Sequence, residues 1–401
     1  MLNLDDRQPP PKPFALFELG FRPFFLLAGL FAVIAMGLWF LVYRGYWPGI
    51  GALSREGMSW HGHEMIYGYA LAVVAGFLLT AVRNWTGVDT ARGWRLASIA
   101  LCWALGRIAF LAPGEAGLWL AALGDGLFLV LLTAALLRPI ARVRQWKQLG
   151  ILSKLVLLLF ADALYYAGVF GYLSDGVQWG LFSGLYLILA LIFVMARRVI
   201  PFFIERGVDE EIELTNWLWL DIASLALFLA WAVVDVFFPG QHDLLGMLSL
   251  ALVVLHGTRL VQWYAIGIWR KPLLWSLYLG YAWLVLGFAL TALSAWGGLS
   301  AFLALHAFAV GGIGLTTLGM MSRVALGHTG RNVFEPPALL GPLFALLSLA
   351  ALARVFAPIL MPGAYRFWIV VAQWLWMSAF AGFVFHYLPV LIRPRIDGRP
   401  G

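Results

Sequence analysis

The chain has 401 residues, of which 62% are hydrophobic and only 12% are charged, whereas an ordinary soluble domain carries about 25% charged residues. A soluble globule of this composition would expose large apolar patches and aggregate. The composition therefore excludes a soluble enzyme, a disordered protein and a fibrous coiled coil. A single Cys excludes a disulfide scaffold. The net charge of +7 is not gathered into a basic face, so we expect no nucleic-acid partner.

Long apolar stretches follow one another along the whole chain. We predict an all-α, polytopic membrane protein with about twelve transmembrane helices in a lipid bilayer, since each stretch can cross about 30 Å of hydrocarbon. We expect one transmembrane helical domain at 14–392, between a disordered cytoplasmic tail at 1–13 and a cytoplasmic tail at 393–401. The expected spans are 22–43, 61–82, 95–112, 117–137, 151–171, 179–199, 217–237, 243–263, 274–294, 300–322, 337–357 and 368–392.

Positive charge alternates from one connection to the next. The first connection and every second one after it hold few of the 27 Lys and Arg residues, namely Arg44, Arg55, Arg354 and Arg366. Arg107 falls inside the third span, and the others are assigned to the remaining connections and the tails. Cytoplasmic connections collect Lys and Arg in membrane proteins. The bias therefore predicts that both termini are cytoplasmic.

Three histidines are expected near the outer ends of their spans. Ionisable groups at membrane depth are costly and are functional candidates, and neutral imidazole is the commonest metal ligand. His61 and His63 open the second span from the outer side, and His306 lies roughly 9 Å deep in the tenth, at a rise of about 1.5 Å per residue. We predict that these three share a metal or haem site, with Glu64 contributing to it or hydrogen bonding to a ligating imidazole.

The spacing of His61 and His63 leaves two geometries open. On a regular helix, residues two apart point about 200° apart and do not meet, whereas in an extended segment they share a side. Gly62 permits a non-helical start, in which case the two imidazoles hold one metal. If the segment is helical, His63 faces Tyr67 and His61 faces Glu64. If the two histidines bind no ligand, this segment is a turn at the membrane interface.

A second group of histidines is expected toward the cytoplasmic side. His256 and His386 are lone intramembrane histidines, for which hydrogen-bonded packing and haem ligation are both open. His328 is expected in the loop just past the tenth span and is a candidate metal ligand. His242, in a short outer loop, is expected to be solvated.

Other polar and sulfur-containing residues lie within the spans. Acids such as Asp125 and Asp162 could line a proton path or pair with Arg107. Met320 and Met321 are expected in the core rather than on copper. No catalytic residue follows from these patterns. The haem-attachment motif CxxCH does not occur in the sequence, so any haem is held noncovalently.

Four segments of the chain also match a known family. They are FELGFRPFFLLAG (17–29), WHGHEMIYGYALAVVAGFLLTAVRNWTG (60–87), RRVIPFF (197–203) and HAFAVGGIGLTTLGMMSRVALGHTGR (306–331). Together they resemble the NnrS family of bacterial inner-membrane proteins linked to nitric oxide and nitrosative stress. The resemblance covers residues 14–392.

The resemblance implies a multi-pass protein of the bacterial cytoplasmic membrane that contains haem b and copper. Four candidate histidines lie inside the matching segments: His61, His63, His306 and His328. His256 and His386 lie outside them. Haem–copper oxidases and nitric oxide reductases take copper ligands from their sixth and seventh helices, but spans 179–199 and 217–237 contain no histidine here. Any haem–copper centre must therefore be built elsewhere.

Two functions from different classes are open. The first is a haem-dependent redox protein that binds or reduces nitric oxide at a His-ligated centre, with a quinol or a cytochrome as electron donor. The second is a membrane transporter of metal, haem or a nitrosylated iron species. Transporters often have Gly- or Pro-broken helices at matching positions in two halves, and the sequence shows no such pair.

Overall fold

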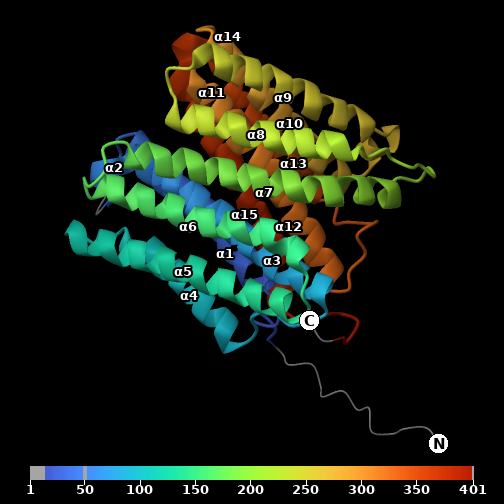
Figure 1. The fold of residues 1–401 in the computed structure, drawn as a ribbon. Helices are drawn as coiled ribbons and strands as arrows, with labels where there is room; N and C mark the ends of the chain where they lie inside the picture. Colours follow the sequence, from blue (N-terminus) through green and yellow to red (C-terminus); the bar gives the residue numbers. More distant parts are fainter. Residues whose placement is uncertain (1–13, 48–51, 400–401) are drawn as a thin grey trace, which may run out of the picture.

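The computed structural model describes residues 14–47 and 52–399. Eleven helices in this part of the chain are long and apolar enough to cross a membrane, and no strand occurs in it. The predicted all-α polytopic fold is therefore confirmed, and the helices run side by side as a bundle (Figure 1). The tail expected at 1–13 lies outside the described residues, as do residues 400 and 401 of the second tail.

Several membrane helices are assembled from more than one helical piece. The pieces are α1 (Phe21–Tyr43), α2 (Ala52–His63), η1 (Glu64–Ala70), α3 (Leu71–Thr86), α4 (Trp94–Ala109), α5 (Gly114–Arg142), η2 (Trp146–Gln148), α6 (Leu149–Val169), α7 (Gly176–Gly207), α8 (Leu218–Phe237), α9 (His242–Gln262), η3 (Ile266–Arg270), α10 (Pro272–Ala295), α11 (Ala301–His306), η4 (Ala307–Gly314), α12 (Leu315–His328), α13 (Leu340–Val355), α14 (Ala357–Leu360), η5 (Pro362–Ala364) and α15 (Tyr365–Ile392). Of the η segments, η1 and η4 are π-helices and the others are 3₁₀ turns.

The helix α4 accounts for the difference between eleven and the expected twelve. It covers most of the span expected at 95–112 but ends at Ala109 after 16 residues. A helix of this length is about 24 Å long, which is less than the roughly 30 Å of a hydrocarbon core. The turn that follows leads to Gly114, whose φ of +74° suits glycine. The helix α4 is thus a short twelfth member that packs along α5.

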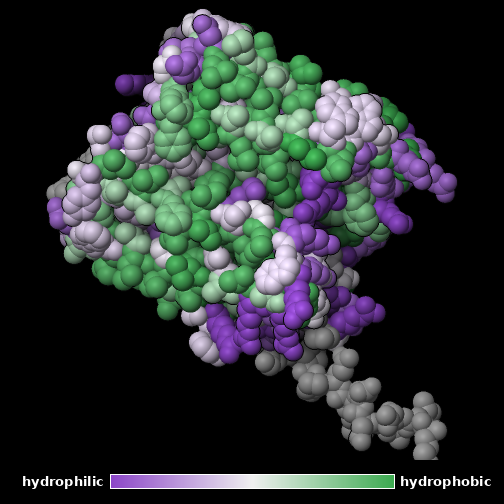
Figure 2. All heavy atoms as spheres, in the orientation of Figure 1, coloured by the Kyte–Doolittle hydropathy of each residue, from purple (hydrophilic) through white to green (hydrophobic). Residues whose placement is uncertain are grey.

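The two ends of the described chain meet at one end of the bundle (Figure 1). The backbone N–H of Ala15 donates to the carbonyl of Ile392 at 2.8 Å. The buried guanidinium of Arg22 donates to the carbonyls of Leu391 and Arg393 at 2.9 and 2.7 Å. A helix leaves its last carbonyls unpaired, and these carbonyls attract a cation. The two ends of the described chain therefore lie on one side of the bundle, as the charge alternation predicts, and Figure 2 shows strongly hydrophilic residues gathered there.

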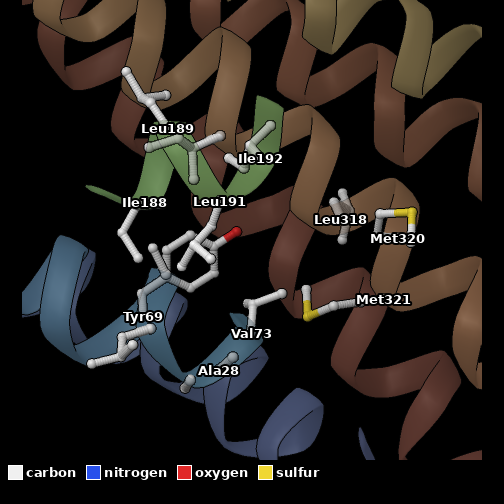
Figure 3. Close-up of a cluster of buried hydrophobic side chains, with 14 of the residues drawn as sticks. Ala28, Tyr69, Val73, Ile188, Leu189, Leu191, Ile192, Leu318, Met320 and Met321 are labelled. Atoms are coloured by element: carbon white, nitrogen blue, oxygen red, sulfur yellow. The ribbon is translucent and has the colours of Figure 1, made fainter. Parts of the chain in front are cut away.

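The apolar core lies where α1, α3, α7 and α12 come together (Figure 3). Ala28 of α1, Val73 of α3 and Leu191 of α7 belong to this cluster, and all three are buried. Met320 and Met321 of α12 belong to the same hydrophobic cluster, which is the core position expected for them. This packing fixes the positions of the helices that carry the polar residues described below.

Candidate metal centres

Two membrane helices change from α- to π-helix at a histidine. The helix α2 ends at His63 and continues as η1, and α11 ends at His306 and continues as η4. π-Helical turns are rare and are frequent at functional sites. Because Ala52–His63 is helical, His61 and His63 point in different directions and do not hold one metal together. Gly62 does not produce the non-helical start that the sequence allowed.

His63 points into a group of ionisable side chains buried between helices. We call this group the carboxylate cluster; its members are His63, Glu64, Arg107, Asp125 and Asp162, all buried. The Nε2 atom of His63 lies 2.8 Å from Oδ1 of Asp162 and 3.9 Å from Oδ2 of Asp125. Its Nδ1 atom lies 3.0 Å from Oε1 of Glu64. His63, Asp125 and Asp162 each offer one ligand atom within 4.8 Å of the others, so the three could hold a metal ion.

Arg107 compensates part of the negative charge of this cluster. Its Nη2 atom lies 2.5 and 2.6 Å from the two carboxylate oxygens of Asp125, and its Nε atom lies 3.0 Å from Oε2 of Glu64. The hydroxyl of Tyr166 also donates to Asp125, at 2.7 Å. Three ionised carboxylates against one guanidinium leave an excess of negative charge, whether His63 is neutral or protonated.

Aromatic rings surround the imidazole of His63. The ring stacks against Tyr165 and Tyr67, with centroids 4.3 and 4.8 Å away, and the ring of Phe110 meets it edge-on at 5.3 Å. The hydroxyl of Tyr67 donates to the carbonyl of Gly180 at 2.8 Å, which fixes this ring against α7. The rings exclude water from the cluster and lower the local dielectric, which strengthens the interactions between its charges.

His61 and His306 lie in the same region of the bundle, and we call these two residues the histidine pair. The ring of His61 stacks on Trp39 at 5.0 Å with an interplanar angle of 7°. Arg354 lies in the same region as both histidines. The Nδ1 atom of His306 lies 2.7 Å from the carbonyl oxygen of Phe302. A carbonyl only accepts hydrogen bonds, so Nδ1 carries the proton and Nε2 keeps its lone pair.

Two buried nitrogen atoms beside the histidine pair lack hydrogen-bond partners within the described chain. They are Nδ1 of His61 and Nη1 of Arg354. Arg354 lies within α13 and is buried, not in a solvated connection as its place in the charge count implied. A buried polar atom without a partner is costly, so this end of the bundle carries donors and acceptors that the protein itself does not satisfy.

The three outer histidines therefore divide between two places. The structure places His61 and His306 in one region, and it places His63 in the carboxylate cluster with Glu64 as its hydrogen-bond partner. All three histidines were expected at a similar depth in the membrane, but their side chains point in different directions. The ligand roles predicted for these residues remain predictions.

His256 lies in a separate part of the bundle. Its Nδ1 atom is 2.6 Å from the hydroxyl of Tyr281, and its ring packs between Phe193 and Phe288, with centroids 4.3 and 5.6 Å away. Its Nε2 atom is buried and has no hydrogen-bond partner among the described residues. Both readings of His256, as a packed residue and as a ligand, are compatible with these contacts.

The other expected inner histidines have different neighbours. His328 is the last residue of α12 rather than a loop residue, and its ring lies 5.8 Å from that of Phe21. His386 lies in α15 beside Tyr387 and is half-buried. Within the described residues, no hydrogen bond or ring contact joins these two histidines to each other or to His256. His242 begins α9 and is exposed.

Sequence reasoning missed the grouping of the acids with His63. It treated Asp125 and Asp162 as members of a proton path or as partners of Arg107. The structure pairs Arg107 with Asp125 and gives Asp162 to His63. A usable signal was present, because all four residues lie in the outer halves of four consecutive expected spans.

The comparison with known families agrees with this architecture. The model of the NnrS protein family matches residues 15–395, nearly the whole chain. Among curated proteins, none matches the sequence. The match includes the helices that carry the carboxylate cluster and the histidine pair, and the chain belongs to the NnrS family.

Proposed function

We propose that this membrane protein acts in nitric oxide metabolism or nitrosative-stress defence, by binding or reducing nitric oxide at a His-ligated metal centre of haem b and copper. The observation that carries the proposal is the histidine pair. His61 and His306 come from two helices that lie far apart in the sequence, and a π-helical segment begins directly after His306 and close behind His61. Membership of the NnrS family supports the same role.

The donor atoms of the histidine pair suit these cofactors. Imidazole is a good ligand for iron and copper. The hydrogen bond from Nδ1 of His306 to the Phe302 carbonyl orients the ring and leaves Nε2 available, as is usual for a metal-ligating histidine. A ligand bond to Nδ1 of His61 would satisfy an atom that otherwise has no partner. The guanidinium of Arg354 offers a charge that fits a carboxylate such as a haem propionate.

The chain's own residues would prepare this site for its reaction. His61 and His306 would hold the metal, and stacking on Trp39 fixes the orientation of the His61 ring. Arg354 places a positive charge beside both histidines. When bound, ferrous haem supplies a binding site for nitric oxide, and copper supplies one-electron chemistry. A quinol or a cytochrome would provide the electrons.

Other histidines are candidate ligands for a further cofactor. His256 has an Nε2 atom without a partner in the described chain, and His386 is half-buried in α15. We include both as possible haem ligands, and His328, at the end of α12, as a possible metal ligand. None of these three contacts the histidine pair through a hydrogen bond or ring contact within the described residues.

The experiment is a comparison of pigment and metal content in matched variants. The protein is purified from cells supplied with haem and copper, and its optical spectrum is recorded before and after reduction and addition of nitric oxide. We expect a Soret band that shifts with nitric oxide, and we expect acid–organic extraction to release the haem. His61→Ala and His306→Ala should lose the shift and the bound metal, whereas His242→Ala, changed at an exposed position, should keep both.

Two outcomes contradict the proposal. One is a colourless preparation that contains neither iron nor copper. The other is full metal content and an unchanged response to nitric oxide in both histidine variants, at the same protein level as the unchanged protein. A colourless protein that carries labelled haem or metal across vesicles would instead favour the transporter.

A further inference from the structure

We propose that the carboxylate cluster binds one divalent metal ion, separate from any haem or copper at the histidine pair. The ligands are Nε2 of His63 and one carboxylate oxygen each from Asp125 and Asp162. These residues come from α2, α5 and α6. The resulting site is a one-histidine, two-carboxylate centre enclosed by the first half of the chain.

The distances between the donor atoms fit a shared metal ion. Two atoms that each lie about 2.1 Å from one metal can be at most about 4.2 Å apart. The Nε2 atom of His63 lies 2.8 Å from Asp162 and 3.9 Å from Asp125. All three donor atoms lie within 4.8 Å of one another. The side chains therefore need only small adjustments to surround one ion.

The charges of the cluster call for a cation. Glu64, Asp125 and Asp162 are opposed by Arg107 alone, and all four are buried. A protonated His63 would still leave one negative charge without compensation, and buried charge of this kind is strongly unfavourable. A divalent ion bound to neutral His63 would bring the sum to zero. The charge balance and the distances between the donor atoms thus both favour a divalent cation.

Groups around the three donors hold them in a ligating orientation. With Nε2 of His63 on the metal, Nδ1 donates its proton to Glu64, which lies 3.0 Å away. A carboxylate behind a ligating histidine fixes its tautomer and is typical of metal sites. Asp125 is oriented by Arg107 and by the Tyr166 hydroxyl at 2.7 Å. The position of Glu64 behind the His63 imidazole is therefore a second observation in favour of a metal ion, separate from the sum of the charges.

The donor set also indicates the class of metal. Carboxylate oxygens suit Mn²⁺ and other hard ions, and imidazole suits Fe²⁺ and Zn²⁺, whereas cuprous copper prefers thiolate and thioether sulfur. The three donors here are one imidazole and two carboxylates. We therefore assign the site to a divalent ion such as Mn²⁺, Fe²⁺ or Zn²⁺ rather than to the copper of the proposed nitric oxide centre.

The test uses Mn²⁺ as the probe on the full-length protein in detergent. The protein is stripped with a chelator and titrated with MnCl₂, and bound Mn²⁺ is measured by electron paramagnetic resonance. We expect one ion per chain and, in pulsed spectra, coupling to a single imidazole nitrogen. Asp162→Asn should weaken binding by about 10-fold or more, whereas Asp235→Asn should not. Asp235 is a matched control, because it is an acid in α8 that accepts a hydrogen bond from Tyr186.

The outcomes separate this proposal from the nitric oxide centre. His306→Ala should keep Mn²⁺ binding even where it loses haem or copper. The metal site would be overturned if the stripped protein bound no Mn²⁺ and the protein as isolated contained no Zn²⁺, Mn²⁺ or non-haem iron. That result would favour a proton on one carboxyl group in place of the metal ion. Bound Mn²⁺ without nitrogen coupling would also overturn it, and this measurement needs no variant that might fail to fold.

Discussion

The hydroxyl groups of Tyr69 and Thr317 lie 2.5 Å apart and join the two helices that contain π-helical turns. Tyr69 belongs to η1, and Thr317 lies in α12, just after η4. The Thr317 hydroxyl donates to the carbonyl of Ile313 at 2.6 Å, so Tyr69 is the donor to Thr317. This bond ties the helix that follows His63 to the helix that follows His306.

The first prediction concerns this link. Tyr69→Phe removes one buried hydrogen bond and should lower the unfolding free energy by about 1 kcal/mol. It should also alter the optical spectrum of the histidine pair, because α12, which directly continues η4, would lose its connection to η1. Tyr278→Phe is the control, since it removes a hydrogen bond to the carbonyl of Leu260 elsewhere in the bundle. Thermal unfolding and absorption spectra of both variants provide the measurement. Equal spectra in the two variants would contradict the link.

The second prediction concerns Arg107. Arg107→Ala leaves Asp125 and Glu64 buried without their partner, and removal of one member of a buried ion pair costs about 3–5 kcal/mol. We expect little folded protein in the membrane. Arg138→Ala, at an exposed position of α5, should leave the yield unchanged. Arg107→Lys should recover only part of it, because a single ammonium group does not reproduce the separate contacts of Nη2 with Asp125 and of Nε with Glu64. Fluorescence-detected size-exclusion chromatography gives the folded yields, and normal folding of Arg107→Ala would contradict this account.

The third prediction concerns the close contact of α6 and α7. A Cβ atom added at Gly180 would lie 2.5 Å from the backbone nitrogen of Tyr165. Gly180→Ala should therefore push apart the two helices, at a cost of about 1–3 kcal/mol, and weaken Mn²⁺ binding, because Tyr165 packs on His63. Gly150→Ala is the control in α6, since nothing lies within 4 Å of its added atom. The melting temperature and the Mn²⁺ affinity of both proteins are compared.

The fourth prediction concerns orientation in the membrane. A reporter that is active only in the periplasm should be inactive when fused after Gly401. The same reporter fused after Gly171, in the turn between α6 and α7, should be active. These expectations follow from the excess of Arg and Lys in alternate connections. Strong activity at Gly401 would reverse the assigned orientation and would place the histidine pair near the cytoplasm.

The sequence was sufficient for the all-α, multi-pass fold, but not for the direction of each histidine side chain. Depth can be counted along a helix at a fixed rise per residue, and this count brought His61 and His306 to one end. Direction depends on how each helix is rotated and on local π-helical turns, which hydrophobic periodicity does not show. His63 therefore turned to Asp162 instead of His306.

The sequence also did not predict which residues surround the two sites, for a related reason. Arg354 was counted with the outer connection because it lies only three residues from the end of its expected span at 337–357. Asp125 and Asp162 were recognised as buried acids, but their pairing depends on which helices are neighbours. The contacts of α5 with α6 and of α4 with α5 supply this information, and a single sequence does not.

The contact between Arg22 and the end of α15 has a consequence for how the protein is made. The residues of the bond to Leu391 are 369 positions apart, so the first helix enters the membrane long before its partners exist. Until then the guanidinium has to reach the headgroup region along its own side chain. The hydrogen bonds of Arg22 to the end of α15 can therefore form only after α15 has been made, so this part of the bundle closes late.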